Sequence, residues 1–134
     1  MDLGKAVIVA GIGCRKGAEA AEIEAAIAAA LERAGRPLAR VDLMATSTGK
    51  RAEKGIADAA AARGVRLVFV TPADLEIASA RGATWSARVL ALAGVPSVAE
   101  AAALAACGPE ATLILARIVV GPVTCALASA EGAP

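Results

Sequence analysis

The sequence predicts a single α/β domain over residues 1–134, a three-layer α/β/α arrangement with a mostly parallel or mixed sheet of about five strands. Short apolar runs rich in β-branched residues alternate with longer segments whose apolar residues recur at helical spacing. The apolar content of 57% is enough to build a core in a chain of 134 residues. This alternation is typical of helices that cover both faces of a sheet.

A strand, a glycine loop and a helix are predicted at the start of the chain. The run KAVIVA at residues 5–10 is apolar after its lysine, as in a strand covered on both faces. The loop GIGCRKG follows at residues 11–17. Residues 18–34 carry apolar side chains at helical spacing with glutamates on the other side, and Gly35 is a common residue just after a helix.

The middle of the chain repeats this order. A second strand is predicted over residues 38–43, where apolar and polar residues alternate imperfectly. The segment TSTGK at residues 46–50 has the composition of a turn with helix-capping residues, and a helix is predicted over residues 51–63 before Gly64. RLVFVT, at residues 66–71, is the clearest strand pattern in the sequence.

Helix signals dominate the next part. Thr71 before Pro72 is a helix-start signal, and further helical residues are predicted over 85–92. Ser97 and Glu100 have the spacing of a capping box, so another helix is predicted to begin there.

Two strands are predicted at the end of the chain, over residues 112–120 and 123–128. Gly121-Pro122 separates them and is typical of a hairpin-like break. An antiparallel pair is therefore expected at this end of the sheet.

Charge and hydropathy exclude several classes of partner. Fourteen Lys and Arg against thirteen Asp and Glu leave a net charge of +1, which gives no overall attraction to nucleic acid or to an anionic membrane. Apolar stretches are interrupted before the roughly 18 to 20 residues needed to span a bilayer. A cytoplasmic protein is expected, with no nucleic acid and no membrane as partner, and any anion site would be local.

The absence of histidine limits the available chemistry. It excludes Ser-His-Asp catalysis and removes the commonest zinc ligand. Cys14, Cys107 and Cys125 have neither the spacing of a zinc site nor that of a disulfide framework. No metal and no cofactor are expected, so any catalysis would use carboxylates, hydroxyls, Lys, Cys or backbone groups.

The glycine loop is the first candidate binding site. Gly11, Gly13 and Gly17 favour a sharp turn that exposes backbone amides, and Arg15 and Lys16 add positive charge before a helix N-terminus. Such a corner suits an anion, although the pattern is neither a dinucleotide fingerprint nor a P-loop. A tight turn whose glycines serve only packing explains the pattern equally well.

Cys14 lies in the same loop beside two cations, an environment that lowers a thiol pKa and favours a nucleophile. A small apolar residue in a tight turn is the favoured interpretation, because no histidine is present to activate the thiol.

Hydroxyls and carboxylates at two later junctions are further candidates. Thr46 and Ser47, with Glu53 soon after, lie where a strand is predicted to meet a helix, and ligands usually bind at this edge of an open sheet. Ser97 and Glu100 lie at another helix start. Helix capping is the favoured alternative for both groups.

Three segments in this order resemble the CobE/CbiG C-terminal family of cobalamin (vitamin B12) biosynthesis: GIGCRKG after the first strand, the Thr/Ser-rich turn near Glu53, and GVPSVAEAAAL at residues 94–104. The resemblance covers essentially the whole chain. It implies a protein that binds a precorrin or cobalt-precorrin intermediate, with other corrin-pathway enzymes as further partners. Residues 117–120 read RIVV, without the lysines that the family tends to carry there, which argues against carboxylate binding at this edge.

The resemblance and the residues together give a candidate ligand site and an open choice of function. Corrin precursors are flat macrocycles fringed with carboxylates, so a partner needs an apolar cleft bordered by amide donors and cations. The candidate ligand-binding residues are Gly11, Gly13, Cys14, Arg15, Lys16, Gly17, Thr46, Ser47 and Ser97.

Three functions stay open. The first is binding without chemical change, as in a CobE-like protein. The second is hydrolysis of the cobalt-precorrin δ-lactone, which the resemblance associates with the longer CbiG proteins and in which Glu53 or Glu100 would activate water. The third is a phosphate- or nucleotide-binding α/β domain that uses the glycine loop.

Overall fold

The computed structural model describes residues 7–37, 40–80 and 98–130. The helical stretch predicted over residues 85–92 and the candidate Ser97 lie outside the described residues.

The five strands of the described residues form one open mixed sheet in the order β3-β2-β1-β5-β4. β1 (Val7–Cys14) pairs in parallel with β2 (Leu43–Ser47), which pairs in parallel with β3 (Arg66–Val70). On the other side of β1, β5 (Val123–Ala130) and β4 (Thr112–Val120) add antiparallel strands. The change from parallel to antiparallel pairing therefore falls between β1 and β5.

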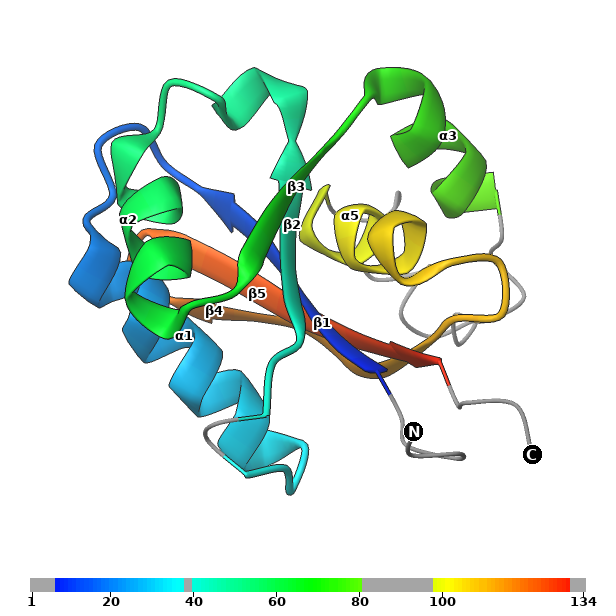
Figure 1. Cartoon of the computed structure of the whole chain (residues 1–134), viewed down its shortest axis with the longest axis horizontal. Helices are drawn as coiled ribbons and strands as arrows, with labels where there is room; N and C mark the ends of the chain where they lie inside the picture. Colours follow the sequence, from blue (N-terminus) through cyan, green and yellow to red (C-terminus); the bar gives the residue numbers. More distant parts are fainter. Residues whose placement is uncertain (1–6, 38–39, 81–97, 131–134) are drawn as a thin grey trace.

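Helices cover both faces of this sheet (Figure 1). α1 (Ala20–Arg33) and α2 (Lys54–Arg63) lie on one face, and α3 (Pro72–Ala80) and α5 (Val98–Cys107) lie on the other. A short 3-10 turn, η1 (Thr48–Lys50), joins β2 to the segment before α2. The predicted three-layer α/β architecture is confirmed. Among the described residues, every helix is too short or too polar to pass through a bilayer.

Each face of the sheet has its own apolar core because side chains alternate along β1. Ile8 and Ile12 belong to the core under α1 and α2, with Ile27 of α1. Val9 belongs to the core on the opposite face, with Leu104 of α5. Both faces of the central strand are therefore buried, as its continuously apolar sequence predicts.

Local sequence signals place two helix boundaries correctly. The hydroxyl of Thr71 accepts a hydrogen bond of 3.1 Å from the amide of Asp74, and Pro72 is the first residue of α3. Gly64 ends α2 in the left-handed conformation, with φ of 70°.

The glycine motif is partly strand rather than loop, so the prediction of a loop over residues 11–17 is wrong in its first half. β1 continues to Cys14, and its last residues pair with β5. Gly11 is required by packing: a Cβ there would overlap the carbonyl oxygen of Ala99 and lie 2.8 Å from the Cβ of Ala103. α5 thus lies directly on the middle of the sheet, and only a glycine allows this approach.

The second strand lies later in the chain than predicted. It spans Leu43–Ser47, whereas the alternating pattern predicted residues 38–43. Thr46 was predicted in a turn, but it is fully buried in β2, and its hydroxyl donates a hydrogen bond of 2.7 Å to the carbonyl oxygen of Ile12. A buried hydroxyl with a partner on the neighbouring strand stabilises a polar residue inside a sheet.

Candidate functional site

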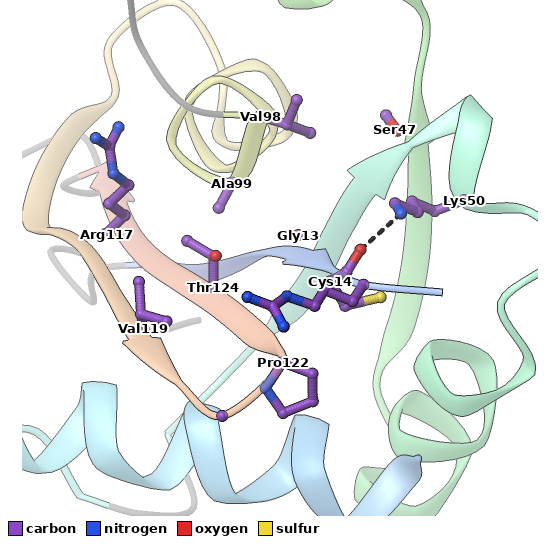
Figure 2. A pocket seen from close by; sticks show the side chains of 12 residues that line it. Gly13, Cys14, Ser47, Lys50, Val98, Ala99, Arg117, Val119, Pro122 and Thr124 are labelled. Carbon is purple, nitrogen blue, oxygen red and sulfur yellow. Dashed lines mark hydrogen bonds between the residues drawn. The ribbon is translucent and has the colours of Figure 1, made fainter. Parts of the chain in front are cut away.

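A cavity of about 450 Å³ opens at the carboxyl ends of β1 and β2, beside the change to antiparallel pairing. In open α/β sheets this switch point is where ligands usually bind. Its walls come from the ends of these strands, η1, the start of α5 and the β4–β5 hairpin (Figure 2). We call it the switch-point cavity. It is lined by Gly13, Cys14, Arg15, Ser47, Lys50, Val98, Ala99, Arg117, Val119, Gly121, Pro122 and Thr124.

The charged residues of this lining are all cations: Arg15, Lys50 and Arg117. The described residues place no carboxylate in the lining. Figure 2 shows Lys50 and Arg117 on opposite sides of the cavity. A concentration of positive charge in a concave site favours an anionic ligand, although the net charge of the chain is only +1.

Hydrogen bonds fix the end of β1 that forms the floor of the site. The ammonium group of Lys50 donates a hydrogen bond of 2.6 Å to the carbonyl oxygen of Cys14. The backbone amide of Arg15 donates one of 2.9 Å to the carbonyl oxygen of Pro122 in the β4–β5 hairpin. The cavity walls are thus joined to one another across distant parts of the chain.

Two exposed aliphatic side chains make part of the cavity lining apolar. Val98 is 45% exposed and Val119 is 70% exposed, and both line the switch-point cavity. Exposed apolar residues beside cations suit a ligand that has an apolar surface and acidic substituents.

Glu100 lies behind the cavity wall and is completely buried. Its carboxylate accepts a hydrogen bond of 3.0 Å from the backbone amide of Arg117, and one oxygen lies 3.4 Å from Nη1 of the same residue. The structure therefore places Glu100 against Arg117 and not among the lining residues.

Glu53 lies at a different part of the surface, away from the switch-point cavity. Its Oε1 accepts a hydrogen bond of 2.8 Å from the backbone amide of Gly17, which ties the β1–α1 loop to the start of α2. Glu53, Lys16 and Gly17 line a second hollow of about 570 Å³ between the first turns of α1 and α2. Neither Ser47 nor Glu53 caps the helix that follows it with its side chain, so the capping interpretation is wrong for both.

The structure thus separates the candidate residues instead of uniting them. Gly13, Cys14, Arg15 and Ser47 line the switch-point cavity, Lys16, Gly17 and Glu53 line the second hollow, Gly11, Thr46 and Glu100 lie in the interior, and Ser97 falls outside the described residues.

The environment of Cys14 differs from the one the sequence suggests. Burial raises the pKa of its thiol above the ordinary value, and this outweighs the ammonium of Lys50, which lowers the pKa, while Glu53 raises it further. This environment disfavours the thiolate, which argues against the interpretation of Cys14 as an activated nucleophile.

Two cavity cations were not among the candidates. Lys50 belongs to the segment TSTGK, but the candidates there were hydroxyls. The lack of lysines at residues 117–120 argued against carboxylate binding at this edge, but Arg117 itself lines the cavity and supplies a cation there. It is the one charged residue in the apolar sequence TLILARIVV, and that isolation was the signal for a special role. Within the described residues, no group of three potential metal ligands gathers at any point.

Comparisons with known proteins give the family. The family model described as cobalamin synthesis G C-terminus matches residues 8–128. Protein CobE from Sinorhizobium sp. is 37% identical over 121 residues, which make up 90% of this chain and 79% of that protein.

Solved structures agree with this result. Cobalamin biosynthesis protein chiG from Agrobacterium tumefaciens str. C58 is 44% identical with a TM-score of 0.75, covering 91% of this chain and 97% of that one. The crystal structure of CobE, a protein of the cobalamin pathway, is 36% identical with a TM-score of 0.80, covering 96% and 98%. A cobalamin biosynthesis protein G homologue from Sulfolobus solfataricus is 27% identical with a TM-score of 0.67, and the match covers 94% of this chain but 37% of that one. The chain therefore belongs to the CobE/CbiG C-terminal family of cobalamin biosynthesis proteins.

Proposed function

We propose that this protein binds a precorrin-type tetrapyrrole intermediate in the switch-point cavity. The observation that carries the proposal is the lining itself, in which Arg15, Lys50 and Arg117 stand beside exposed valines. Precorrins combine an apolar ring with a fringe of acetate and propionate groups. The cations would receive the carboxylates, and the valines would contact the ring.

The size of the cavity limits how such a ligand would lie. A volume of about 450 Å³ falls within the usual range for small-molecule sites. It accommodates one edge of a macrocycle with its acidic side chains. The rest of the ring would extend over Val119, which is 70% exposed on the edge strand β4.

Binding without cleavage is favoured over lactone hydrolysis by the positions of the two candidate carboxylates. A general base has to come within hydrogen-bonding reach of the water that it activates. Glu100 is fully buried against Arg117, and Glu53 lies in the second hollow, bound to the amide of Gly17.

Binding of a phosphate or nucleotide at the glycine loop is also disfavoured. Such a site uses free backbone amides at the start of a helix. The amide of Gly17, which leads into α1, already donates to the carboxylate of Glu53. A phosphate would have to displace this carboxylate and would be repelled by it.

Titration of the purified protein with precorrin and cobalt-precorrin intermediates tests the proposal, with absorbance of the ligand and fluorescence of Trp85 as readouts. The ligand is then recovered and analysed by mass spectrometry. We expect it to bind and to return unchanged. A ligand that returns shortened by a two-carbon fragment would establish a hydrolase, and thermal protection by nucleotide but not by corrinoid would establish the third function.

Adjacent cations in the chain provide a matched pair of variants. Arg15 lines the switch-point cavity, whereas Lys16 lines the second hollow. Arg15→Ala should weaken binding about tenfold, the usual effect of losing one charge-assisted hydrogen bond, and Lys16→Ala should change it little. Equal effects of the two substitutions would place the ligand elsewhere.

A further inference from the structure

Arg117 lies in an irregular part of the edge strand β4. Leu115 lies opposite Leu127 of β5. Ile118, three residues further along β4, lies opposite Cys125, only two residues back along β5, so β4 contains one extra residue in this interval. A β-bulge of this kind interrupts the ladder and redirects a side chain. Here it leaves the backbone amide of Arg117 directed at α5, where it donates to Glu100 at 3.0 Å.

Glu100 holds Arg117 at two points. Its carboxylate is 0% exposed and contacts both the backbone amide of Arg117 and the Nη1 atom of the guanidinium. The backbone contact does not depend on the side-chain conformation of Arg117. A buried carboxylate is costly unless a cation and hydrogen bonds accompany it, so α5 and β4 are held together through this pair.

Part of the guanidinium of Arg117 is still available to a ligand. The side chain is 34% exposed and lines the switch-point cavity. Among the described residues, its guanidinium contact is the one between Nη1 and Glu100, which at 3.4 Å is long. The other donors of the planar group are free to form paired hydrogen bonds with a carboxylate.

The other two cavity cations, Lys50 and Arg15, are less suited to binding a ligand carboxylate through paired hydrogen bonds. The ammonium group of Lys50 already donates to the carbonyl oxygen of Cys14. The side chain of Arg15 is exposed and has to be ordered when a ligand binds, which costs binding free energy. Arg117 is held in place before the ligand arrives.

We infer that Arg117 selects ligands with a free carboxylate over ligands in which that group is amidated, and that Glu100 is the positioning residue for Arg117. This inference rests on the proposed function. An amide offers an oxygen acceptor but no negative charge, so it forms a weaker bond with a guanidinium than a carboxylate does. The protein would therefore bind a corrinoid before amidation of the side chain that enters the cavity.

Two corrinoids with the same ring serve as probes: cobyrinic acid, with free acetate and propionate groups, and cobinamide, in which these groups are amidated. The ratio of their dissociation constants is the readout, because a merely structural defect weakens both probes alike. We expect the wild-type protein to prefer cobyrinic acid, and Arg117→Gln to reduce that preference about tenfold. Arg117→Lys keeps the positive charge but loses the paired donors of the guanidinium, so it should keep part of the preference for cobyrinic acid.

Two further variants separate positioning from stability. Glu100→Gln keeps an oxygen for the amide of Arg117 but removes the ion pair, and should reduce the preference by a smaller factor. The double variant Glu100→Gln/Arg117→Gln leaves no uncompensated buried charge, so it keeps the test possible if Arg117→Gln does not fold. Its preference should equal that of Arg117→Gln, because Glu100 acts through Arg117. Arg66→Gln, an exposed arginine on β3, is the matched control.

The outcomes are distinct. If the wild-type protein binds neither corrinoid, the proposed function fails and the inference fails with it. If it binds cobyrinic acid preferentially and the Arg117 variants keep that preference, the proposed function stands and the inference is overturned. Equal weakening of both probes in Glu100→Gln would show that Glu100 only supports the fold.

Discussion

The ammonium group of Lys50 donates a hydrogen bond of 2.6 Å to the carbonyl oxygen of Cys14, the last residue of β1. This contact joins η1 to the carboxyl end of the central strand and keeps a positive charge at the edge of the switch-point cavity. One side chain therefore contributes both to the stability of the site and to its charge.

Lys50→Met should lower both the stability of the protein and its affinity for an anionic ligand. We expect a loss of about 1 kcal/mol in the free energy of unfolding, because a partly buried carbonyl loses its donor. Affinity for a polycarboxylate tetrapyrrole should fall several-fold, and its salt dependence should weaken. Urea unfolding and ligand titration at two salt concentrations measure these effects. Lys54→Met, at an exposed lysine in the first turn of α2, is the control and should leave affinity unchanged.

Gly11→Ala and Gly13→Ala should have very different effects, although both glycines lie in β1. A Cβ at Gly11 would overlap backbone atoms of α5, whereas a Cβ at Gly13 would meet, among the described residues, only the Cβ of Thr124 at 3.8 Å, an ordinary contact. We expect Gly11→Ala to lower the free energy of unfolding by about 3 kcal/mol or to prevent folding, and Gly13→Ala to leave it within about 0.5 kcal/mol. Similar unfolding curves for the two variants would contradict the close packing of α5 on β1.

Thr46→Val tests the hydrogen bond between β2 and β1. Valine keeps the shape of threonine but leaves the carbonyl oxygen of Ile12 without this donor. The expected cost is about 1–3 kcal/mol, measured by urea unfolding. Thr46→Ser keeps the hydroxyl and loses one methyl group, so it should cost about 1 kcal/mol. A valine variant as stable as the wild type would show that the hydroxyl does not matter.

The thiol of Cys14 should react slowly with iodoacetamide near neutral pH. Because burial raises its pKa, the reactive thiolate forms only at higher pH than in an unfolded peptide. The rate of alkylation at Cys14, measured by mass spectrometry at a series of pH values, should increase only at a pH above the one at which an ordinary thiol ionises. Cys125 is a reference within the same protein: it is fully buried, burial raises its pKa to about 12, and it should stay unmodified while the fold is intact.

Charge substitutions should move the pKa of Cys14 in opposite directions. Lys50→Met removes a charge that lowers this pKa, so the alkylation profile should shift to higher pH. Glu53→Gln removes a charge that raises it, so the profile should shift to lower pH. Shifts of the same sign in the two variants would contradict this arrangement of charges.

The type and order of most elements could be predicted because local chemistry determines them. The apolar spacing of residues 18–34 gave α1, and Thr71 with Pro72 gave the start of α3. The hairpin break at Gly121-Pro122 gave the antiparallel β4–β5 pair. These features depend on neighbours in the sequence.

The position of β2 and the extension of β1 depend on contacts between distant residues, so the second strand was predicted too early in the chain and the first too short. The alternation over residues 38–43 suggested a strand, but the buried strand includes Thr46, whose hydroxyl finds its partner on β1. Gly11 was read as a turn residue because glycine is common in turns. Its real requirement, contact with α5, depends on a helix far along the chain.

The sequence singled out the end of the first strand as a candidate site but did not identify all the residues that line the cavity there. The end of the first strand was expected to bind a ligand, and it does border the switch-point cavity. Arg117 reaches that cavity because β5 lies between β1 and β4, and Lys50 reaches it because β2 pairs in parallel with β1. Periodicity does not reveal this strand order. Lys16, within the glycine motif, and Glu53, directly before α2, line the second hollow instead.

The position of β5 also determines when the sheet and the cavity can form during synthesis of the chain. β1 leaves the ribosome before the other strands of this sheet, but its partner on one side, β5, follows all of them in the sequence. Until Val123 and the residues after it emerge, one edge of β1 has no neighbour and the hairpin wall of the cavity does not exist. The switch-point cavity therefore cannot form before nearly all of the described residues have been translated.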